Sequence, residues 1–426
     1  MKQLKFVHTA DLHLDTPFKG LSAWNPDLAG KLKDATYRSF SNIVDLCISE
    51  RVDFLLIAGD IFDSENMSLA AQIRFIDELK RLSASNIPAY FICGNHDNLA
   101  SWDTSLTLPP GVHRFGSSGV EKMTYLHDND TVADIYGISY QDSYIFEDLV
   151  PFYRRTGKSA PFSIAMLHGM ADVVGRDEKY APFSLKDLID QPFDYWALGH
   201  VHKGRVLHDH PPVVYPGNPQ GRDFGETGEK GCYLVEMAAG AKPRLKFIPV
   251  QHVRFEELSI DLTGHDDISE LVALIDRARE KLMSGGRNQG FVLRLLLTGR
   301  TGMHKILNRP GEADQLAEEL NTGQPDQECF SFVDSLRIMT RPATDPAQIT
   351  QGSDFAGELI KNIERYENDS ELLDTLTGQL INELPVARIF REVDELSETD
   401  KRGILERAKW ILTDRLADYA AGDDAL

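Results

Sequence analysis

Five short segments of this chain share one pattern, in which an apolar, strand-like run ends at a residue able to bind a metal ion. The residues at these ends supply two carboxylates, one amide and four imidazoles: Asp11, His13, Asp60, Asn95, His168, His200 and His202. Strands of α/β sheets present functional groups at their carboxyl ends, so five such ends can converge on one site. This donor set is large enough for two divalent cations, which together can stabilise both oxygens of a phosphoryl transfer.

Two pairs of these residues are spaced two apart. Asp11 and His13 form one pair, and His200 and His202 form the other. On an extended strand, residues i and i+2 point to the same side, so both members of a pair can face one ion. A mixed oxygen and nitrogen set without thiolates suits Mn, Fe, Zn or Co better than Ca or a soft metal.

The single carboxylate Asp60 and the histidine after Asn95 extend the predicted chemistry. Asp60 follows Gly59, which allows a sharp turn and a close approach of the backbone, so this carboxylate could bridge two ions. His96 directly follows Asn95 and should lie beside the metals. An imidazole there can donate a proton to a leaving alkoxide as general acid. We interpret Asp97 as a turn or cap residue and His8 as a packed core residue.

Composition limits the class of protein. The 426 residues exceed a usual single core, the hydrophobic fraction is an ordinary 42%, and the formal net charge is −21. This charge argues against a generally basic nucleic-acid binder, although bound cations would dominate the charge of their own site. No apolar run approaches the roughly 18 residues that span a bilayer, and the four scattered cysteines are typical of reduced thiols. We therefore expect a cytoplasmic protein without membrane association.

The order of periodic segments predicts three parts. Residues 1–250 alternate strands with helices, including helices over 34–50 and 68–83, and the turn-rich stretch 109–142 predicts antiparallel strands. Residues 251–342 read β-α-β-α-β, which predicts a small α+β domain. Residues 353–426 contain helical patterns only and are acidic.

The five motifs, D-x-H, GD, GNH, H and GH-x-H in this order, resemble those of the calcineurin-like metallophosphoesterase superfamily. The resemblance covers about residues 1–250. It implies an α/β fold, a β-sandwich flanked by helices, and it distributes the ligands over two ions. One ion would be held by Asp11, His13, Asp60 and His202; the other would be held by Asp60, Asn95, His168 and His200. It also implies that His96 is the general acid and that Asp63, three residues after Asp60, is its orienting carboxylate.

The sequence around these motifs is similar to the SbcD family of DNA repair exonucleases, in its YhaO-like branch. The similar segments are ADLHLD, LLIAGDIFD, ICGNHD and a Gly-rich loop after GHVH. This resemblance implies a Mn2+-dependent phosphodiesterase that acts on DNA as an exonuclease or endonuclease, with Fe, Zn or Co as other candidate ions. It implies a capping, DNA-binding domain at 251–342 and a tail at 353–426 that docks an SMC-like coiled-coil ATPase. It also suggests a homodimer.

Three functions stay open at this point. The first is DNA hydrolysis, for which four basic residues near the last motif are candidate phosphate contacts or members of a solvated charged loop: Lys203, Arg205, Arg222 and Lys230. The second is a phosphodiesterase for nucleotides or another small phosphoester. The third is a non-catalytic scaffold, which the intact ligand set and His96 argue against, because a scaffold needs neither.

Overall fold

The computed structural model describes most of the chain, in the ranges 3–16, 26–63, 68–99, 102, 107–156, 160–172, 180–285, 289–322, 329–343, 355–383, 400–409 and 411–412. It divides into two units. The first comprises residues 1–256, 286–292 and 325–331, and the second comprises residues 257–285, 293–324 and 332–426. The candidate metal ligands all belong to the first unit.

The first unit contains a six-stranded sheet of order β12-β11-β1-β2-β3-β4. Its strands are β1 (Gln3–Thr9), β2 (Phe54–Ala58), β3 (Ala89–Ile92), β4 (Val112–Arg114), β11 (Gly231–Ala238) and β12 (Arg244–Pro249). Strands β1 to β4 pair in parallel, while β11 is antiparallel to both β1 and β12. The crossovers are the amphipathic helices α2 (Pro26–Glu50) and α3 (Leu69–Ala84), the latter capped by Ser68, whose side chain accepts from Ala71 N.

A second six-stranded sheet has the order β5-β6-β7-β8-β10-β9. Its strands are β5 (Glu121–His127), β6 (Asp130–Gly137), β7 (Phe162–His168), β8 (Tyr195–Gly199), β9 (Arg205–Asp209) and β10 (Pro212–Tyr215). Strands β6, β7, β8 and β10 run parallel, and β5 and β9 are antiparallel edge strands. The helix α4 (Leu185–Asp190) and the 3-10 turn η2 (Val150–Phe152) belong to the same half of the unit.

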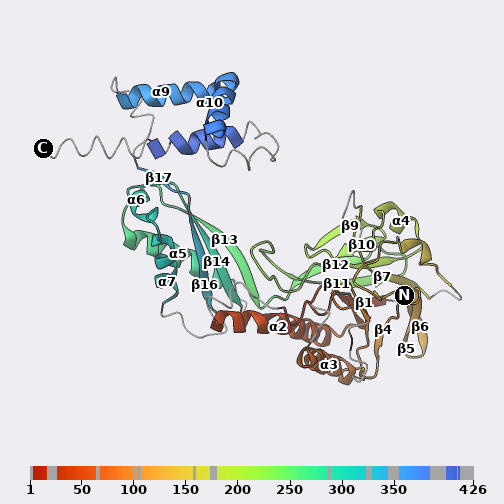
Figure 1. Ribbon diagram of the computed structural model, residues 1–426. Helices are drawn as coiled ribbons and strands as arrows, with labels where there is room; N and C mark the ends of the chain where they lie inside the picture. The colour runs from red at the N-terminus through yellow and green to blue at the C-terminus, as the bar shows by residue number, and fades with distance from the viewer. Residues whose placement is uncertain are drawn as a thin grey trace. The chain divides into compact units, whose positions relative to one another are not determined.

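Apolar side chains hold the two sheets together. One buried cluster takes residues from both sheets, such as Phe6 and Phe54 from the first and Ile164 and Tyr195 from the second. A second cluster packs the outer face of the first sheet against α2 and α3 (Figure 1). The all-buried pattern of β2, β3, β7 and β8 follows from this burial on both faces.

The rest of the chain forms smaller elements. A three-stranded sheet joins β13 (Val253–Asp261), β14 (Gly290–Thr298) and β16 (Ser331–Ile338), with α5 (Ile268–Met283), α6 (His304–Leu307) and α7 (Glu312–Asn321) between its strands. A short sheet pairs β15 (Arg300–Thr301) with β17 (Arg341–Pro342). Later in the sequence follow α9 (Phe355–Asn368), α10 (Ser370–Glu383) and helical residues 400–409 and 411–412.

The predicted α/β class, with sheets flanked by helices, is confirmed. The two predicted helices are present, and α2 begins earlier than expected, at Pro26. The prediction of antiparallel strands over 109–142 holds for the β5–β6 hairpin but is wrong for β4, which pairs in parallel with β3. The three domain boundaries stay predictions, as do the functions assigned to 251–342 and 353–426. Among the described residues, no helix is long and apolar enough to cross a bilayer.

Candidate metal centre

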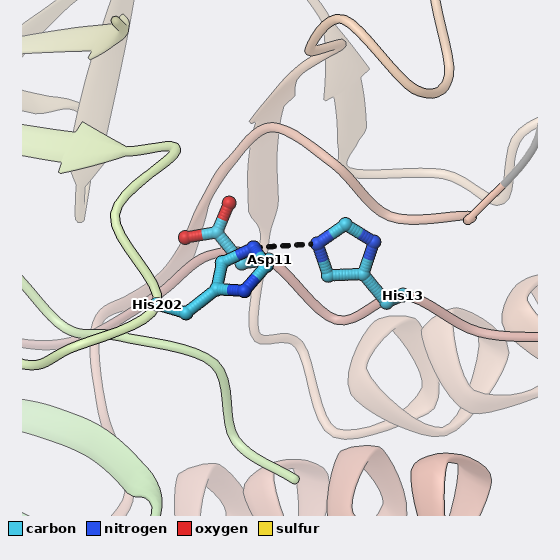
Figure 2. A group of neighbouring side chains, drawn as sticks. All are labelled: Asp11, His13 and His202. Atoms are coloured by element: carbon cyan, nitrogen blue, oxygen red, sulfur yellow. Dashed lines mark hydrogen bonds between the residues drawn. The ribbon is translucent and has the colours of Figure 1, made fainter. Parts of the chain in front are cut away.

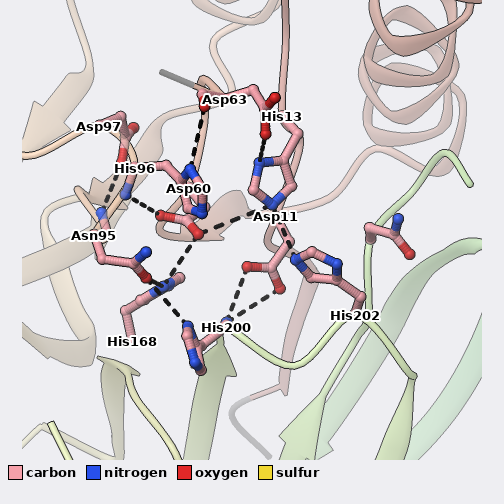
Figure 3. A network of polar contacts seen from close by, with 12 residues as sticks. Asp11, His13, Asp60, Asp63, Asn95, His96, Asp97, His168, His200 and His202 are labelled. Atoms are coloured by element: carbon pink, nitrogen blue, oxygen red, sulfur yellow. Dashed lines mark hydrogen bonds and ion pairs between the residues drawn. The ribbon is translucent and has the colours of Figure 1, made fainter. Parts of the chain in front are cut away.

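The seven candidate ligands follow the carboxyl ends of five strands and lie together at one place (Figure 3). Strands β1, β2 and β3 come from the first sheet, and β7 and β8 come from the second. The carboxyl ends of parallel strands meet at one edge of a sheet, so packing the two sheets face to face brings both edges together. The positions that the sequence predicted as ligands therefore lie side by side, although they are spread over almost two hundred residues.

The first group of donors consists of Asp11, His13 and His202 (Figure 2). One possible ligand atom from each lies within 4.8 Å of the others. The Nε2 atoms of His13 and His202 approach to 3.0 Å. The Asp11 carboxylate accepts from the main-chain N of His200 at 2.9 Å, which ties the end of β1 to the end of β8.

The second group consists of Asp60, His168 and His200, again with ligand atoms within 4.8 Å of one another. Asn95 completes it, because its Oδ1 lies 3.0 Å from His168 Nε2 and 3.1 Å from His200 Nδ1. Four side chains from β2, β3, β7 and β8 thus point at one small volume (Figure 3).

Asp60 lies between the two groups. Its Oδ2 is 3.4 Å from His168 Nε2 and 3.9 Å from His13 Nε2. Its Oδ1 accepts from the main-chain N of His96 at 3.0 Å. A carboxylate in this position can contribute to both groups at once, which is the geometry expected of a bridging ligand.

The backbone at these strand ends is strained. Asp11, His13, Asp60 and His200 all have positive φ, at 52°, 44°, 50° and 98°. Non-glycine residues rarely adopt this region, and when they do they cluster at functional sites. Gly59 also has positive φ, at 91°, and a Cβ atom there would collide with the His168 ring. Glycine at this position is therefore required both by conformation and by the closeness of a ligand.

Burial and neighbouring charges shift the pKa values of the site's carboxyl and imidazole groups. Burial raises the pKa of Asp11, and the neighbouring Asp60 carboxylate raises it further. Burial acts in the same direction on Asp60, but His168 outweighs it and holds the pKa of Asp60 well below its usual range. Burial disfavours charge on His168, yet Asp60 raises the pKa of that imidazole to about 9. The pKa of His200 falls to about 3 through burial and the nearby His168.

Two divalent ions would relieve this crowding of buried carboxylates, since bound cations become the largest local charges in a site. The donors are carboxylate, amide and imidazole, without thiolate, which suits borderline divalent metals. The residues present therefore fit a pair of divalent ions.

His96 and Asp63 lie beside the first group, but their contact differs from the expected one. His96 Nδ1 is 3.1 Å from the main-chain oxygen of Asp63. The Asp63 carboxylate instead lies 3.0 Å from His13 Nδ1 and accepts from Arg222 Nη1 at 2.9 Å. The orientation of His96 thus rests on the backbone of the loop after β2, and the carboxylate of Asp63 acts on His13 and Arg222.

Sequence reasoning did not assign a role to Glu226, which lies in the Gly-rich loop after β10. Its Oε1 is 2.7 Å from His202 Nδ1, and its Oε2 accepts from Asn218 Nδ2 at 2.7 Å. Burial would raise the pKa of Glu226, but His202 and Arg222 lower it instead. The sequence offered only a weak signal for Glu226. It is an acid in the loop after the pair His200 and His202, and such loops are usually solvated.

Arg222 is part of the same network. Besides Asp63, its guanidinium contacts His202 Nδ1 at 3.0 Å and Glu226 Oε1 at 3.3 Å. Lys230 Nζ donates to the main-chain oxygen of His202 at 3.3 Å, and Lys203 and Arg205 are exposed. Of the four candidate phosphate contacts, two are therefore engaged with the site's own groups.

Two plainer interpretations are confirmed. The carboxylate of Asp97 accepts from the main-chain N of Gly94 and of Ile61, at 2.7 and 3.0 Å, and so fixes the loop that carries Asn95. His8 is fully buried in β1, 3.0 Å from Tyr195 Oη and 3.2 Å from the oxygen of Leu198.

Comparison with known proteins gives matches along almost the whole chain. Residues 4–204 match the family described as Calcineurin-like phosphoesterase, and residues 255–341 match the family described as Metallophosphoesterase YhaO, middle domain. A Bacillus subtilis protein named "Uncharacterized metallophosphoesterase YhaO" is 36% identical over 418 residues, 98% of each chain. A Sulfurisphaera tokodaii protein named "DNA double-strand break repair protein Mre11" is 30% identical over 213 residues, 49% of this chain and 51% of the relative. A solved dimetal phosphatase from Danio rerio aligns with a TM-score of 0.34 at 12% identity, over 57% of this chain and 98% of that one.

Proposed function

The chain belongs to the calcineurin-like metallophosphoesterases, and from this membership we propose that it hydrolyses phosphodiester bonds of DNA. The observation that carries the proposal is the convergence of seven ligand side chains on one site, with His96 beside them. The choice of DNA draws support from two relatives named as DNA double-strand break repair proteins, which align with 49% and 66% of this chain.

In the proposed site, Asp11, His13 and His202 hold one ion, while Asn95, His168 and His200 hold the other, and Asp60 contributes to both. Two divalent ions supply an activated water at neutral pH and stabilise the charge of the reacting phosphate. The ion is proposed to be Mn2+, and Fe, Zn or Co are the alternatives that the donor set also suits.

His96 is the proposed general acid. Its main-chain N contacts Asp60, and its Nδ1 lies 3.1 Å from the Asp63 oxygen, so the ring is held while Nε2 stays available for proton transfer. A protonated Nε2 can donate to the leaving oxygen as the phosphorus–oxygen bond breaks. Asp63 is proposed to position His13 and Arg222 through its carboxylate and His96 through its backbone.

The partners that follow are DNA and, through the tail at 353–426, an SMC-like coiled-coil ATPase. Described tail helices form an apolar cluster of their own around Ile360, Ile363, Leu373 and Leu405. Several apolar side chains of the tail remain exposed, among them Phe355, Ile404 and Ile411. A docking role for these exposed residues, and a homodimer, are proposals that a pull-down and a mass measurement in solution would test.

One observation favours a second substrate class. The net charge of −21 and the engagement of Arg222 within the site weaken the case for a strong attraction to a polyanion. A phosphodiesterase for nucleotides or another small phosphoester needs no such attraction.

The decisive experiment measures hydrolysis by the full chain loaded in turn with Mn2+, Zn2+, Fe2+ and Co2+. The substrates are single- and double-stranded oligonucleotides, cyclic nucleotides and bis-p-nitrophenyl phosphate. A His96→Ala preparation made in the same way controls for a contaminating nuclease. Degradation of oligonucleotides by the wild type alone supports DNA as substrate. Turnover of cyclic nucleotides or the aryl diester without cleavage of DNA would replace it by the small-phosphoester function.

A further inference from the structure

Aromatic rings extend outward from the second group of ligands. The ring of Tyr180 lies against that of His200, with centroids 4.7 Å apart and a 37° angle between planes. Tyr144 lies 5.9 Å from Tyr180, and Phe146 lies 6.3 Å from Tyr144. These three residues, which we call the aromatic ladder, form a continuous path from a candidate metal ligand to the surface.

The outer part of the ladder is well exposed. Tyr144 exposes 55% of its surface and Phe146 exposes 68%. Single exposed aromatic residues are common, whereas these two exposed rings adjoin one another and are joined through a third ring to a candidate metal ligand.

The backbone holds the ladder in place. The segment around Ile145 forms a parallel bridge with Tyr180, and Ala181 N donates to the oxygen of Ile145 at 2.7 Å. On its other side, Tyr180 O accepts from Met170 N at 3.1 Å, two residues beyond His168 at the end of β7. The backbone of Tyr180 is thus tied to the segment that directly follows the candidate ligand His168, so its distance from the candidate metal centre is set by the fold.

From this geometry, and resting on the proposed function, we propose that the aromatic ladder is a base-stacking subsite for unpaired nucleotides adjoining the phosphodiester at the metals. A flat ring binds any nucleobase by stacking, because every base has a π face. Bases of an intact duplex are stacked on one another and cannot reach such rings, so the subsite selects single-stranded segments or frayed ends.

The charges around the ladder agree with recognition through bases instead of phosphates. Asp142 and Glu147 flank its exposed end and are themselves exposed. These acids would repel a DNA backbone that ran across the rings, so the free energy of binding at this subsite must come from stacking. The contribution of the ladder should therefore depend weakly on salt, unlike that of a basic groove.

The test is a binding measurement with a fluorescein-labelled oligothymidylate of ten nucleotides and the same strand built from abasic residues. It uses the ion-loaded full chain in a His96→Ala background, so that the probe is not consumed, with metal content and melting temperature recorded for every variant. Wild-type rings should bind the base-bearing strand more tightly than the abasic strand. Tyr144→Ala and Phe146→Ala should each weaken binding of the base-bearing strand, roughly tenfold per ring, and leave binding of the abasic strand unchanged.

Two matched variants separate stacking from general effects. Tyr144→Phe keeps the ring and should bind as the parent does. Phe152→Ala removes a ring of η2 that is similarly exposed, at 52%, but lies outside the ladder, and it should also leave binding unchanged.

The outcomes distinguish this inference from the proposed function. If the wild type cleaves DNA but binds both strands equally, or if the two alanine variants bind as the parent does, the ladder has no role in base recognition and the nuclease function stands. If the base preference and its loss on substitution are seen without cleavage of DNA, the subsite stands and the substrate is a smaller nucleotide. If neither is seen, both proposals are wrong.

Discussion

The two halves of the candidate metal centre both offer carboxylate and imidazole donors, and the second adds the Asn95 amide, but they lie in different surroundings. Around His13 and His202 the neighbours are charged: Asp63, Arg222 and Glu226. Around His168 and His200 the neighbours are rings, because Tyr140 packs edge-on against His168 at 5.5 Å and Tyr180 lies against His200. Charged side chains thus surround one half of the site, and aromatic rings pack against the other half.

This difference shows two ways to orient a ligand imidazole. His202 is oriented by a side chain, since Glu226 Oε1 lies 2.7 Å from its Nδ1. His168 is oriented by the backbone, since the oxygen of Ala58 lies 2.9 Å from its Nδ1. Carboxylate and carbonyl partners both fix the tautomer and the ring. Only the carboxylate can be removed by a single substitution, so we expect the charged half to be the more easily weakened by mutation.

The largest effect should come from Asp60→Ala, because this carboxylate lies between both halves. We expect the variant to lose ions from both groups and its hydrolysis of bis-p-nitrophenyl phosphate to fall to background. Elemental analysis of the purified protein, with the wild type alongside, measures the ions retained per chain. Two tightly bound ions in the variant would rule out Asp60 as the shared ligand.

His96→Ala should separate chemistry from metal binding. The side chain is the proposed proton donor and is assigned no ion, so both ions should remain while turnover falls by about 10²–10⁴-fold. Steady-state kinetics beside elemental analysis check this. Loss of metal in step with activity would instead make His96 a ligand. Asp63→Ala should show a milder loss of turnover, because His13 and Arg222 lose a carboxylate partner while the backbone oxygen that contacts His96 survives the substitution.

Glu226→Ala tests the charged half alone. Removing the carboxylate leaves His202 Nδ1 without this partner, so we expect the affinity of one ion to fall by about 10–100-fold, the usual cost of losing such an outer contact. The second ion should bind as in the wild type. Titration of the ion-free protein by calorimetry resolves the two events.

The matched control for this experiment is Glu229→Ala, three residues along the same loop. Glu229 is an exposed acid paired with Arg254 at 3.9 Å, so its removal changes the charge of the loop without touching His202. Glu226→Gln, which keeps an oxygen acceptor, should recover part of the affinity. An equal effect of Glu226→Ala on both ions, or an equal effect of Glu229→Ala, would remove the distinction between the halves.

The smallest effect on the site should follow truncation after Gly352. Every ligand, and both halves of the network, lie within residues 11–226, so metal content and hydrolysis of the aryl diester should stay near those of the full chain. Association with an SMC-like ATPase should be lost if the tail is the docking surface, and a pull-down measures it. Retained ATPase binding together with a lower melting temperature would show that the tail only stabilises its own chain.

The clustering of the candidate ligands could be predicted from the sequence because each lies at a strand end or within a few residues of one. The sheet order then brings the ends together, so a local pattern determines a long-range site. The roles of Arg222 and Glu226 could not be predicted, since they depend on the path of a long Gly-rich loop. The aromatic ladder could not be predicted from the sequence either, because the bridge between Ile145 and Tyr180 is what brings Tyr144 close to Tyr180. The parallel pairing of β4 was missed because a three-residue strand carries too little pattern to show its direction.

The contacts between strand ends also have a consequence for how the chain folds. His200 N meets the Asp11 carboxylate across 189 residues of sequence, and His168 meets the Ala58 oxygen across 110. Such distant contacts form late, after most of the loop-closure entropy has been lost. A chain in which only one sheet has formed would hold at most four of the seven candidate ligands, so tight ion binding should report that the two sheets have docked. Ions that bind only the native state would in turn stabilise it, by about 2.7 kcal/mol at a free concentration one hundred times Kd. A substitution in the apolar layer between the sheets, far from any candidate ligand, should therefore be detected first as a lower number of bound ions per chain.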